Sequence, residues 1–203
     1  MKIETVSVDS VIIYFEESIS EEVLDKVQHT YRILKGLPGI IDLTPSYHSI
    51  LIHYDLFEYD DTTIKRYLEK KIASAHMDNT KAMGKLIEIP VDYHQGLDLE
   101  RIAQLHGLTK DEVITIHTAT TYRVYAIGFM VGFAYLAKVD ASISTPRLET
   151  PRDKVPKGSV AIAESQTAIY PQQSAGGWNI IGHTDFDDYS SFEIGDRVRF
   201  IAI

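Results

Sequence analysis

Three pairs of proline and a cationic residue recur every five residues in the stretch "TPRLETPRDKVPKGS". The pairs are Pro146-Arg147, Pro151-Arg152 and Pro156-Lys157. Proline lacks the N–H that a helix needs and disfavours helical geometry in the residue before it, so we expect an extended ribbon that presents cations. The planar guanidinium group of arginine binds a carboxylate or phosphate through two parallel hydrogen bonds. Arg147 and Arg152 are therefore candidate anion ligands.

The same ribbon has a plainer interpretation as a solvated surface loop. Between Lys138 and Lys157 five cations stand against three acidic residues, which is an ordinary surface composition. Composition alone favours the solvated loop. The functional interpretation adds that stiff prolines would lower the entropy lost when the arginines bind an anion.

His117 is the histidine whose position most invites a chemical role. It follows Val113 by one turn of a predicted helix and precedes the stretch "TATTYRV". One interpretation is a core histidine at a helix C-terminus, where the helix dipole favours a cation. The other is a general acid/base or anion ligand beside Tyr122. The pattern by itself favours the core histidine.

The segment "GFMVGFAYL" combines glycines with large apolar side chains. Gly128 and Gly132 permit backbone geometries that other residues avoid, or a close approach to a ligand. Phe129 and Phe133 are compatible with a core, a pocket wall or a subunit interface, and the sequence leaves these alternatives open.

The totals exclude several classes of function. The 203 residues carry a formal net charge of -9, which argues against a nucleic-acid partner, and they contain no cysteine. The N-terminus lacks a signal-peptide pattern, and the longest apolar run is too short to span a bilayer, so we expect a cytoplasmic protein without a membrane partner. Phosphate-loop, dinucleotide-binding and zinc-protease motifs are absent, and the scattered histidines predict no metal site.

Two segments with different patterns of predicted secondary structure must position these residues. Up to about Pro90, short strands alternate with amphipathic helices that begin near Ser20 and near Asp60. The stretch "KLIEIPV" completes the order strand, helix, strand, strand, helix, strand, which is a ferredoxin-like α+β arrangement. After two short helices, of which the second starts with a Thr109/Glu112 capping box, short strands broken by glycine and proline indicate a β-barrel or sandwich. We place the domains at residues 1–88 and 89–203.

The C-terminal half resembles the family that includes the sporulation kinase inhibitor KipI, the B-type subunit of bacterial 5-oxoprolinase and subunit 1 of allophanate hydrolase. The resemblance rests on motifs that run from His117 to Thr184. They are His117-Thr118 with Tyr122 and Val124, "GFMVGFAYL", "TPRLETPRDKVPKGSVAIA", "QTAIYP" and "GGWNIIGHT".

The resemblance implies a small α+β domain followed by a cyclophilin-like β-barrel. It implies a second cyclophilin-like subunit as partner, similar to KipA or to the C-type subunit of 5-oxoprolinase, and ATP as co-substrate of a complex that converts 5-oxoproline to glutamate. It also implies a shared cleft or partner-facing surface. The expected catalytic residues are His117, Arg147 and Arg152, and the expected binding residues are Tyr122, Phe129, Phe133, Gln166 and Tyr170.

Two functions compete at this point. The first is an enzyme subunit for ATP-dependent lactam or amide hydrolysis that is inactive without its partners. The second is a KipI-like regulatory protein that binds and inhibits a sensor histidine kinase. Five positions depart from the family pattern, and the changes around His183 make that rim less cationic. These positions are Val131, Glu164, Ala175, His183 and Asp185.

Overall fold

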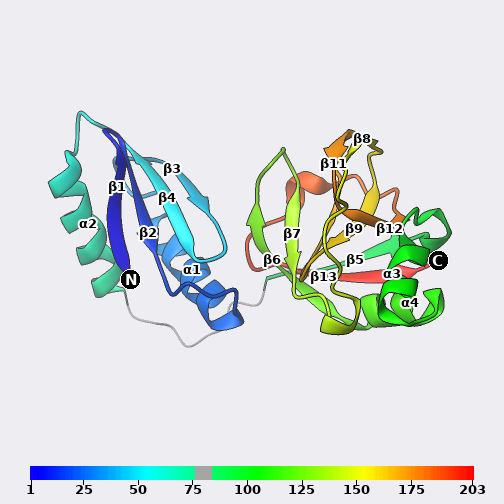
Figure 1. The fold of residues 1–203 in the computed structure, drawn as a ribbon. Helices are drawn as coiled ribbons and strands as arrows, with labels where there is room; N and C mark the ends of the chain where they lie inside the picture. Colours follow the sequence, from blue (N-terminus) through cyan, green and yellow to red (C-terminus); the bar gives the residue numbers. More distant parts are fainter. Residues whose placement is uncertain (76–83) are drawn as a thin grey trace. The chain divides into compact units, whose positions relative to one another are not determined.

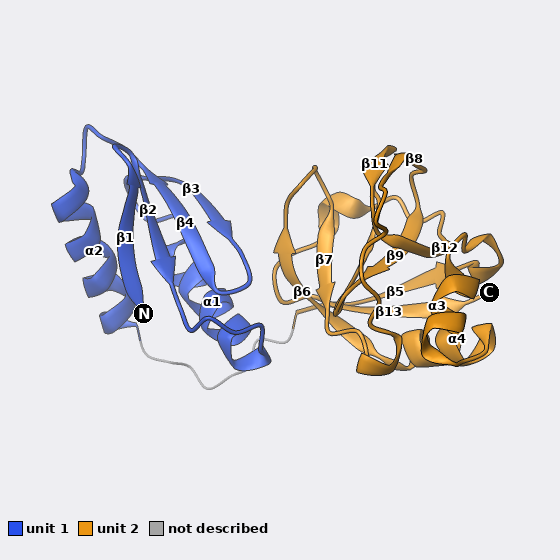
Figure 2. Cartoon of the chain, viewed as in Figure 1, with its two compact units in different colours: residues 1–82 blue, residues 83–203 orange. Residues whose placement is uncertain are grey.

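The computed structural model describes residues 1–75 and 84–203, which form two compact units (Figures 1 and 2). The first unit comprises Met1–Ala82 and the second Met83–Ile203. The expected α+β class, with a predominantly β second part, is confirmed. Among the described residues, no helix combines the length and apolarity needed to cross a bilayer.

The first unit is a four-stranded antiparallel sheet in the order β1-β2-β4-β3, together with two helices. Its elements in chain order are β1 (Lys2–Ser7), β2 (Ser10–Tyr14), α1 (Glu21–Leu34), β3 (Ile40–Pro45), β4 (Ser49–Tyr54) and α2 (Asp61–Ser74). Ser20 caps α1 by accepting from the backbone N–H of Val23, and Asp60 caps α2 through a capping box with Thr63. The predicted helix starts near Ser20 and Asp60 are therefore confirmed.

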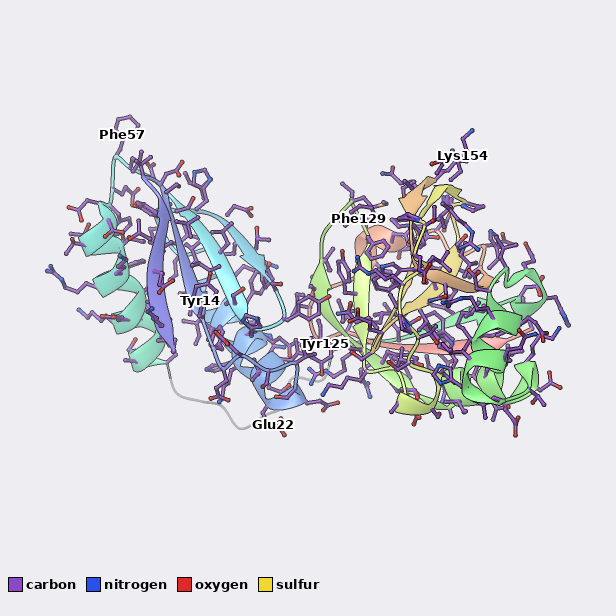
Figure 3. All side chains as sticks on the ribbon, in the orientation of Figure 1. Tyr14, Glu22, Phe57, Tyr125, Phe129 and Lys154 are labelled. Carbon is purple, nitrogen blue, oxygen red and sulfur yellow. The ribbon has the colours of Figure 1, made fainter. Side chains whose placement is uncertain are left out.

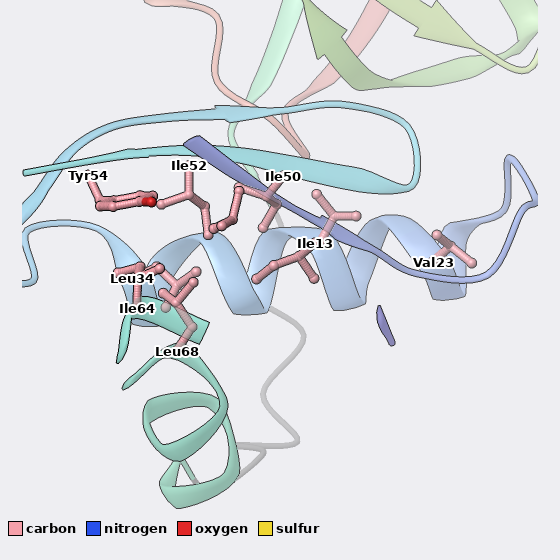
Figure 4. Packing of buried hydrophobic residues seen from close by; sticks show 10 residues of the cluster. Ile13, Val23, Leu34, Ile50, Ile52, Tyr54, Ile64 and Leu68 are labelled. Atoms are coloured by element: carbon pink, nitrogen blue, oxygen red, sulfur yellow. The ribbon is translucent and has the colours of Figure 1, made fainter. Parts of the chain in front are cut away.

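Alternate residues of β2 and β4 build the core of this unit against α1 and α2 (Figure 4). Because side chains alternate across a strand, Ile13, Ile50 and Ile52 all point to the helical side of the sheet. Ile64 and Leu68, one turn apart on α2, are fully buried in the same cluster. The helical spacing of Ile64 and Leu68 in the sequence therefore reflects the burial of one face of α2.

One predicted strand belongs to the other unit. The segment "KLIEIPV" forms β5 (Leu86–Val91), which pairs in parallel with β13 (Arg197–Ala202) over all six residues. The expectation that it closes the first sheet is wrong, and β1, which the sequence did not predict, is the fourth strand. The boundary expected between residues 88 and 89 falls inside β5, whereas the compact units divide before this strand.

The second unit is a nearly closed seven-stranded barrel in the order β12-β9-β10-β7-β6-β13-β5. Its remaining strands are β6 (Thr121–Ile127), β7 (Ala134–Ala137), β9 (Ser159–Ala163), β10 (Gln166–Ile169) and β12 (Asn179–His183). Asp92 and His183 exchange two backbone hydrogen bonds of 2.8 and 2.9 Å, which join the two outer strands at one end. A small ribbon of β8 (Arg152–Val155) and β11 (Ser174–Gly176) completes the strands.

Two helices, α3 (Leu99–His106) and α4 (Lys110–Ala119), lie between barrel strands β5 and β6 in the chain. Thr109 and Glu112 form the predicted capping box at the start of α4, which is confirmed. Short 3-10 turns complete the elements of this unit. They are η1 (Tyr93–Gln95), η2 (Ala141–Ile143) and η3 (Tyr189–Ser191).

Candidate functional site

His117 lies in the last turn of α4 and is completely buried. Its Nδ1 is 2.7 Å from the Tyr93 hydroxyl, and its Nε2 is 3.0 Å from the Thr167 hydroxyl. Its ring stacks on Phe200 with a centroid separation of 4.7 Å. Both nitrogens are engaged and no solvent reaches the ring, so this geometry favours the core histidine over the acid/base role.

The hydrogen bonds around His117 also define its protonation. The Thr167 hydroxyl donates to the carbonyl of Ala161 at 3.0 Å, so its oxygen is left to accept from the His117 Nε2–H. Nδ1 then accepts from the Tyr93 hydroxyl, which describes a neutral imidazole. Burial lowers the pKa of His117 to about 3, which agrees with this tautomer.

Tyr122 belongs to the same buried cluster. It is fully buried, and its hydroxyl donates to the backbone carbonyl of His117 at 3.0 Å. Burial raises the pKa of this hydroxyl well above its ordinary value, so it remains a donor. This hydrogen bond connects β6 to the end of α4, so Tyr122 has a structural role.

Strand β10 separates this cluster from the other predicted residues. Its alternate side chains point to opposite faces, so Thr167 faces His117 while Gln166, Ala168 and Tyr170 share the other face. Ala168 and Tyr170 belong to a distinct hydrophobic cluster. The residues that the family resemblance groups in one cleft or partner-facing surface therefore divide between two environments, one on each side of this strand.

The second environment is an aromatic cluster of Phe133, Tyr135, Tyr170 and Trp178. Phe133 makes edge contacts with the other three rings at centroid separations of 4.9–5.7 Å. Tyr135 is partly buried at the edge of the cluster. Burial raises the pKa of Tyr170, while a hydrogen bond to the Trp178 backbone and the charges of Arg147 and Arg152 act in the opposite direction. The expected positions of Phe133 and Tyr170 therefore lie together beside the predicted arginines.

Arg147 is the exposed cation of this cluster. Its guanidinium carbon lies 5.8 Å from the centre of the Trp178 ring, a cation–π contact. The backbone on either side of Arg147 is fixed next to Trp178. Leu148 N donates to the Gly177 carbonyl at 2.7 Å, and the Asn179 side chain donates to the Pro146 carbonyl at 2.9 Å. Within residues 1–75 and 84–203, no hydrogen bond or ion pair engages the Arg147 guanidinium, which leaves its donors open to a ligand.

Arg152 has a different environment although it belongs to the same ribbon. Its Nη2 donates to Asp98 Oδ1 at 2.7 Å, and Asp98 is buried with its other oxygen accepting from Ile180 N at 2.7 Å. The Nη1 atom of Arg152 is buried without a partner among the described residues. One donor group of Arg152 is therefore occupied by a structural ion pair with Asp98. Because the Arg147 guanidinium has no such partner in the part of the chain that the structure describes, Arg147 is the better candidate for anion binding.

Phe129 lies on the loop between β6 and β7 (Figure 3), and its ring makes an edge contact with Phe133 at a centroid separation of 5.5 Å. Its side chain is 67% exposed and Val131, which departs from the family proline, is 91% exposed. This loop, with Tyr189 and Phe192 opposite, lines an open groove of about 520 Å³. The exposure favours the interface alternative for Phe129, while Phe133 beside it is core.

Gln166 is partly buried and pairs with Ala137 and Ala163 in neighbouring strands. It shares the strand face of Tyr170. No grouping of histidine, aspartate and glutamate side chains suited to a metal ion occurs in the described part of the chain.

Several residues of the site gave no signal in the sequence. The sequence indicates only that a short helix starts at Asp98, yet the Asp98 carboxylate is bound by Arg152 and by the backbone of Ile180. Trp178 and Tyr135 were present in quoted motifs but were not among the expected site residues. A Cβ on Gly176 would overlap the Tyr170 hydroxyl, so the "GGW" pattern was the available clue to a close packing.

The comparisons with known proteins cover the whole chain. The profile of the carboxyltransferase domain, subdomain C and D, matches residues 1–193. The chain is 33% identical to the B-type subunit of 5-oxoprolinase from Bacillus subtilis, over 100% of this chain and 92% of that protein. It is 36% identical to the B-type subunit of 5-oxoprolinase from Haemophilus influenzae, over 84% of this chain and 83% of that protein.

Solved structures agree at the level of the fold. The crystal structure of TTHA0988 matches 97% of this chain with a TM-score of 0.84 and 32% identity, although the chain spans only 40% of that longer protein. PH0987 from Pyrococcus horikoshii is 39% identical over 100% of this chain and 97% of that one, with a TM-score of 0.57. The urea carboxylase of Kluyveromyces lactis, at 14% identity and a TM-score of 0.76, shares the fold alone.

Proposed function

Because the chain belongs to the carboxyltransferase subdomain C and D family, we propose that it is one component of an ATP-dependent 5-oxoprolinase-type complex. Two relatives that are B-type subunits of 5-oxoprolinase match at least 83% of their own length to this chain. Since those relatives are named as subunits, they support a complex with partner chains, of which a second cyclophilin-like subunit is our candidate.

The observation that carries the proposal is the open Arg147 guanidinium on Trp178. 5-Oxoproline is a small molecule with one carboxylate, and a planar guanidinium is the side chain best suited to bind it. The backbone hydrogen bonds beside Arg147 hold the cation at the aromatic cluster before any ligand arrives. Such preorganisation lowers the cost of binding and orienting the substrate.

The chemistry of lactam opening explains why ATP is needed. In the proposed reaction the lactam oxygen takes the γ-phosphoryl group of ATP, and ADP leaves. Water then adds to the activated carbon, the C–N bond breaks, and the nitrogen takes up a proton. A second water hydrolyses the resulting acyl phosphate to glutamate and phosphate.

This chain's proposed contribution is to bind the carboxylate through Arg147 and to shield the site with the aromatic cluster. The sequence contains no phosphate loop, so we assign nucleotide binding to a partner subunit or to a site without that motif. His117 would support the strand that carries Tyr170 rather than exchange protons with substrate.

The proposal is tested with the chain assembled with its partner subunits. The complex should hydrolyse ATP in the presence of 5-oxoproline, and the isolated chain should not. Arg147→Ala should reduce the substrate-dependent rate at low 5-oxoproline, whereas Lys154→Ala, an exposed cation on β8, should not. An assembled complex without 5-oxoproline-dependent hydrolysis would exclude the proposal.

The KipI-like alternative keeps one supporting observation, which is the exposed Phe129 and Val131 on the β6–β7 loop. Exposed apolar side chains at a groove are typical of protein interfaces. A sensor histidine kinase whose autophosphorylation falls when the chain is added, and recovers with Phe129→Ser, would favour this alternative.

A further inference from the structure

The loop between β4 and α2 of the first unit carries two exposed apolar side chains. Phe57 is 100% exposed and Leu56 is 53% exposed. Figure 3 shows Phe57 projecting from the tip of this loop. Burying such a ring contributes roughly 1.5–3 kcal/mol, so Phe57 with the neighbouring Leu56 offers a partner an apolar contact.

Hydrogen bonds to Asp55 hold this loop in one conformation. The Asp55 carboxylate accepts from Phe57 N at 2.8 Å, and its carbonyl accepts from Glu58 N and Tyr59 N at 3.1 and 3.0 Å. Asp55 N in turn donates to the Gly39 carbonyl at 2.9 Å. The backbone that presents Phe57 is therefore tied down on the side of β4.

Tyr59 fixes the other side of the loop. Its ring stacks on Tyr67 of α2 with a centroid separation of 4.9 Å. Gly39, with a φ of +73°, lies beneath the same ring, and a Cβ there would overlap Tyr59 Cε2. An aromatic side chain held on a fixed loop loses little conformational entropy on binding, which is the property of an interface anchor.

The loop is also strongly acidic. Asp55, Glu58, Asp60 and Asp61 lie within seven residues, and the next cation along the chain is Lys65. Asp60 caps α2, and Asp61 hydrogen-bonds to Thr5 and Lys65. The Glu58 carboxylate is exposed and forms no ion pair in the described part of the chain, so it is open to a cationic partner.

We propose that the Leu56–Phe57 loop docks on another protein subunit, whose surface offers an apolar pocket bordered by lysine or arginine side chains. The inference rests on the proposed function, because the partner is a subunit of the proposed complex. Charge complementarity selects this occupant: a second copy of the chain would bring another net charge of -9 toward the acidic loop.

The test compares the affinities of variants for the purified second cyclophilin-like subunit by calorimetry. Phe57→Ser should weaken binding at least about tenfold, as expected for a buried aromatic anchor. Val8→Ser is the matched control, since Val8 is an apolar side chain of the same unit that is 78% exposed. It should change the affinity by less than about twofold. Circular dichroism and thermal unfolding verify that each variant is folded.

A second variant tests the charge. Glu58→Gln should slow association at low salt, and the difference from the unsubstituted chain should vanish at high salt, where exposed charges are screened. Equal association rates of the variant and the unsubstituted chain at low salt would overturn the proposed border of lysine or arginine side chains.

The outcomes separate the inference from the proposed function. If Phe57→Ser binds the partner as tightly as the unsubstituted chain in an active complex, the docking inference is overturned and the proposed function stands. If the chain fails to bind any partner subunit, both are overturned. A self-associated chain that Phe57→Ser converts to monomer would identify a second copy as the occupant, which also overturns the inference.

Discussion

Arg152 Nη2 donates to Asp98 Oδ1 at 2.7 Å, and this pair fastens the proline-cation ribbon to the start of α3. Asp98 also accepts from Ile180 N and donates its own N–H to the Ile180 carbonyl, so the same residue holds β12. The ribbon that looked like a solvated loop is anchored at one arginine and leaves the other open. The two arginines therefore differ in role although their sequence contexts are similar: Arg152 forms a structural ion pair, and the Arg147 guanidinium remains available to a ligand.

The first prediction concerns the stability of this junction. Arg152→Ala leaves the buried Asp98 carboxylate without its cation, and we expect a loss of about 3 kcal/mol in the free energy of unfolding. Urea denaturation measures this loss. Arg199→Ala is the control, because the Arg199–Glu88 pair is exposed and should contribute less than about 1 kcal/mol. Equal effects of the two substitutions would contradict a structural role for Arg152.

The second prediction concerns pH. The pKa of His117 is lowered from 6.5 to about 3 by burial, so the folded protein keeps it neutral. Below about pH 6.5 the unfolded chain binds a proton that the folded chain does not. The free energy of unfolding should therefore fall as the pH falls, by up to about 1.4 kcal/mol per pH unit from this group.

Urea titrations between pH 7 and pH 5 measure this dependence, and His117→Gln is the comparison. The variant should be less stable at pH 7 but show a shallower slope in this interval. An unchanged slope would mean that His117 titrates normally in the folded protein, which would reopen its acid/base role.

The helices were predictable because their signals are local. Asp60 with Thr63 and Thr109 with Glu112 cap helices through side chains three residues apart, and the apolar spacing of α2 follows from one helical face. The sheet that β5 joins was not predictable, because the residue pattern of a strand does not indicate which distant strand it pairs with. Its partner, β13, lies at the other end of the chain.

The site was predictable only in part for the same physical reason. Family motifs grouped Arg147 and Tyr170 with His117 as residues expected to share one cleft or partner-facing surface. The side-chain alternation of β10 separates Thr167, which contacts His117, from Tyr170 on the opposite face. The neutralisation of Arg152 by Asp98 depends on a contact across 54 residues, which no local pattern contains.

The third prediction tests the packing around Tyr170. A methyl group at Gly176 would overlap the Tyr170 hydroxyl and lie 3.0 Å from ring carbon Cζ. Gly176→Ala should lower the free energy of unfolding by about 1–3 kcal/mol through overpacking. Removing the hydroxyl should relieve the closest contact, so Gly176→Ala combined with Tyr170→Phe should lose less than the sum of the single variants. Additive losses in thermal or urea unfolding would show that the two groups do not interact.

The last prediction concerns the interaction of Arg147 with substrate. Lysine keeps the positive charge but lacks the planar fork, so Arg147→Lys should bind a carboxylate through fewer hydrogen bonds. If Arg147 binds the carboxylate equally in the ground state and the transition state, the KM for 5-oxoproline should rise about tenfold while kcat changes little. Steady-state ATP hydrolysis by the assembled complex at varied 5-oxoproline measures both constants. Since Arg147 makes no ion pair within the described residues, its replacement should leave thermal unfolding unchanged. A fall in kcat at unchanged KM would instead place Arg147 at the reacting lactam, where charge develops, rather than at the carboxylate.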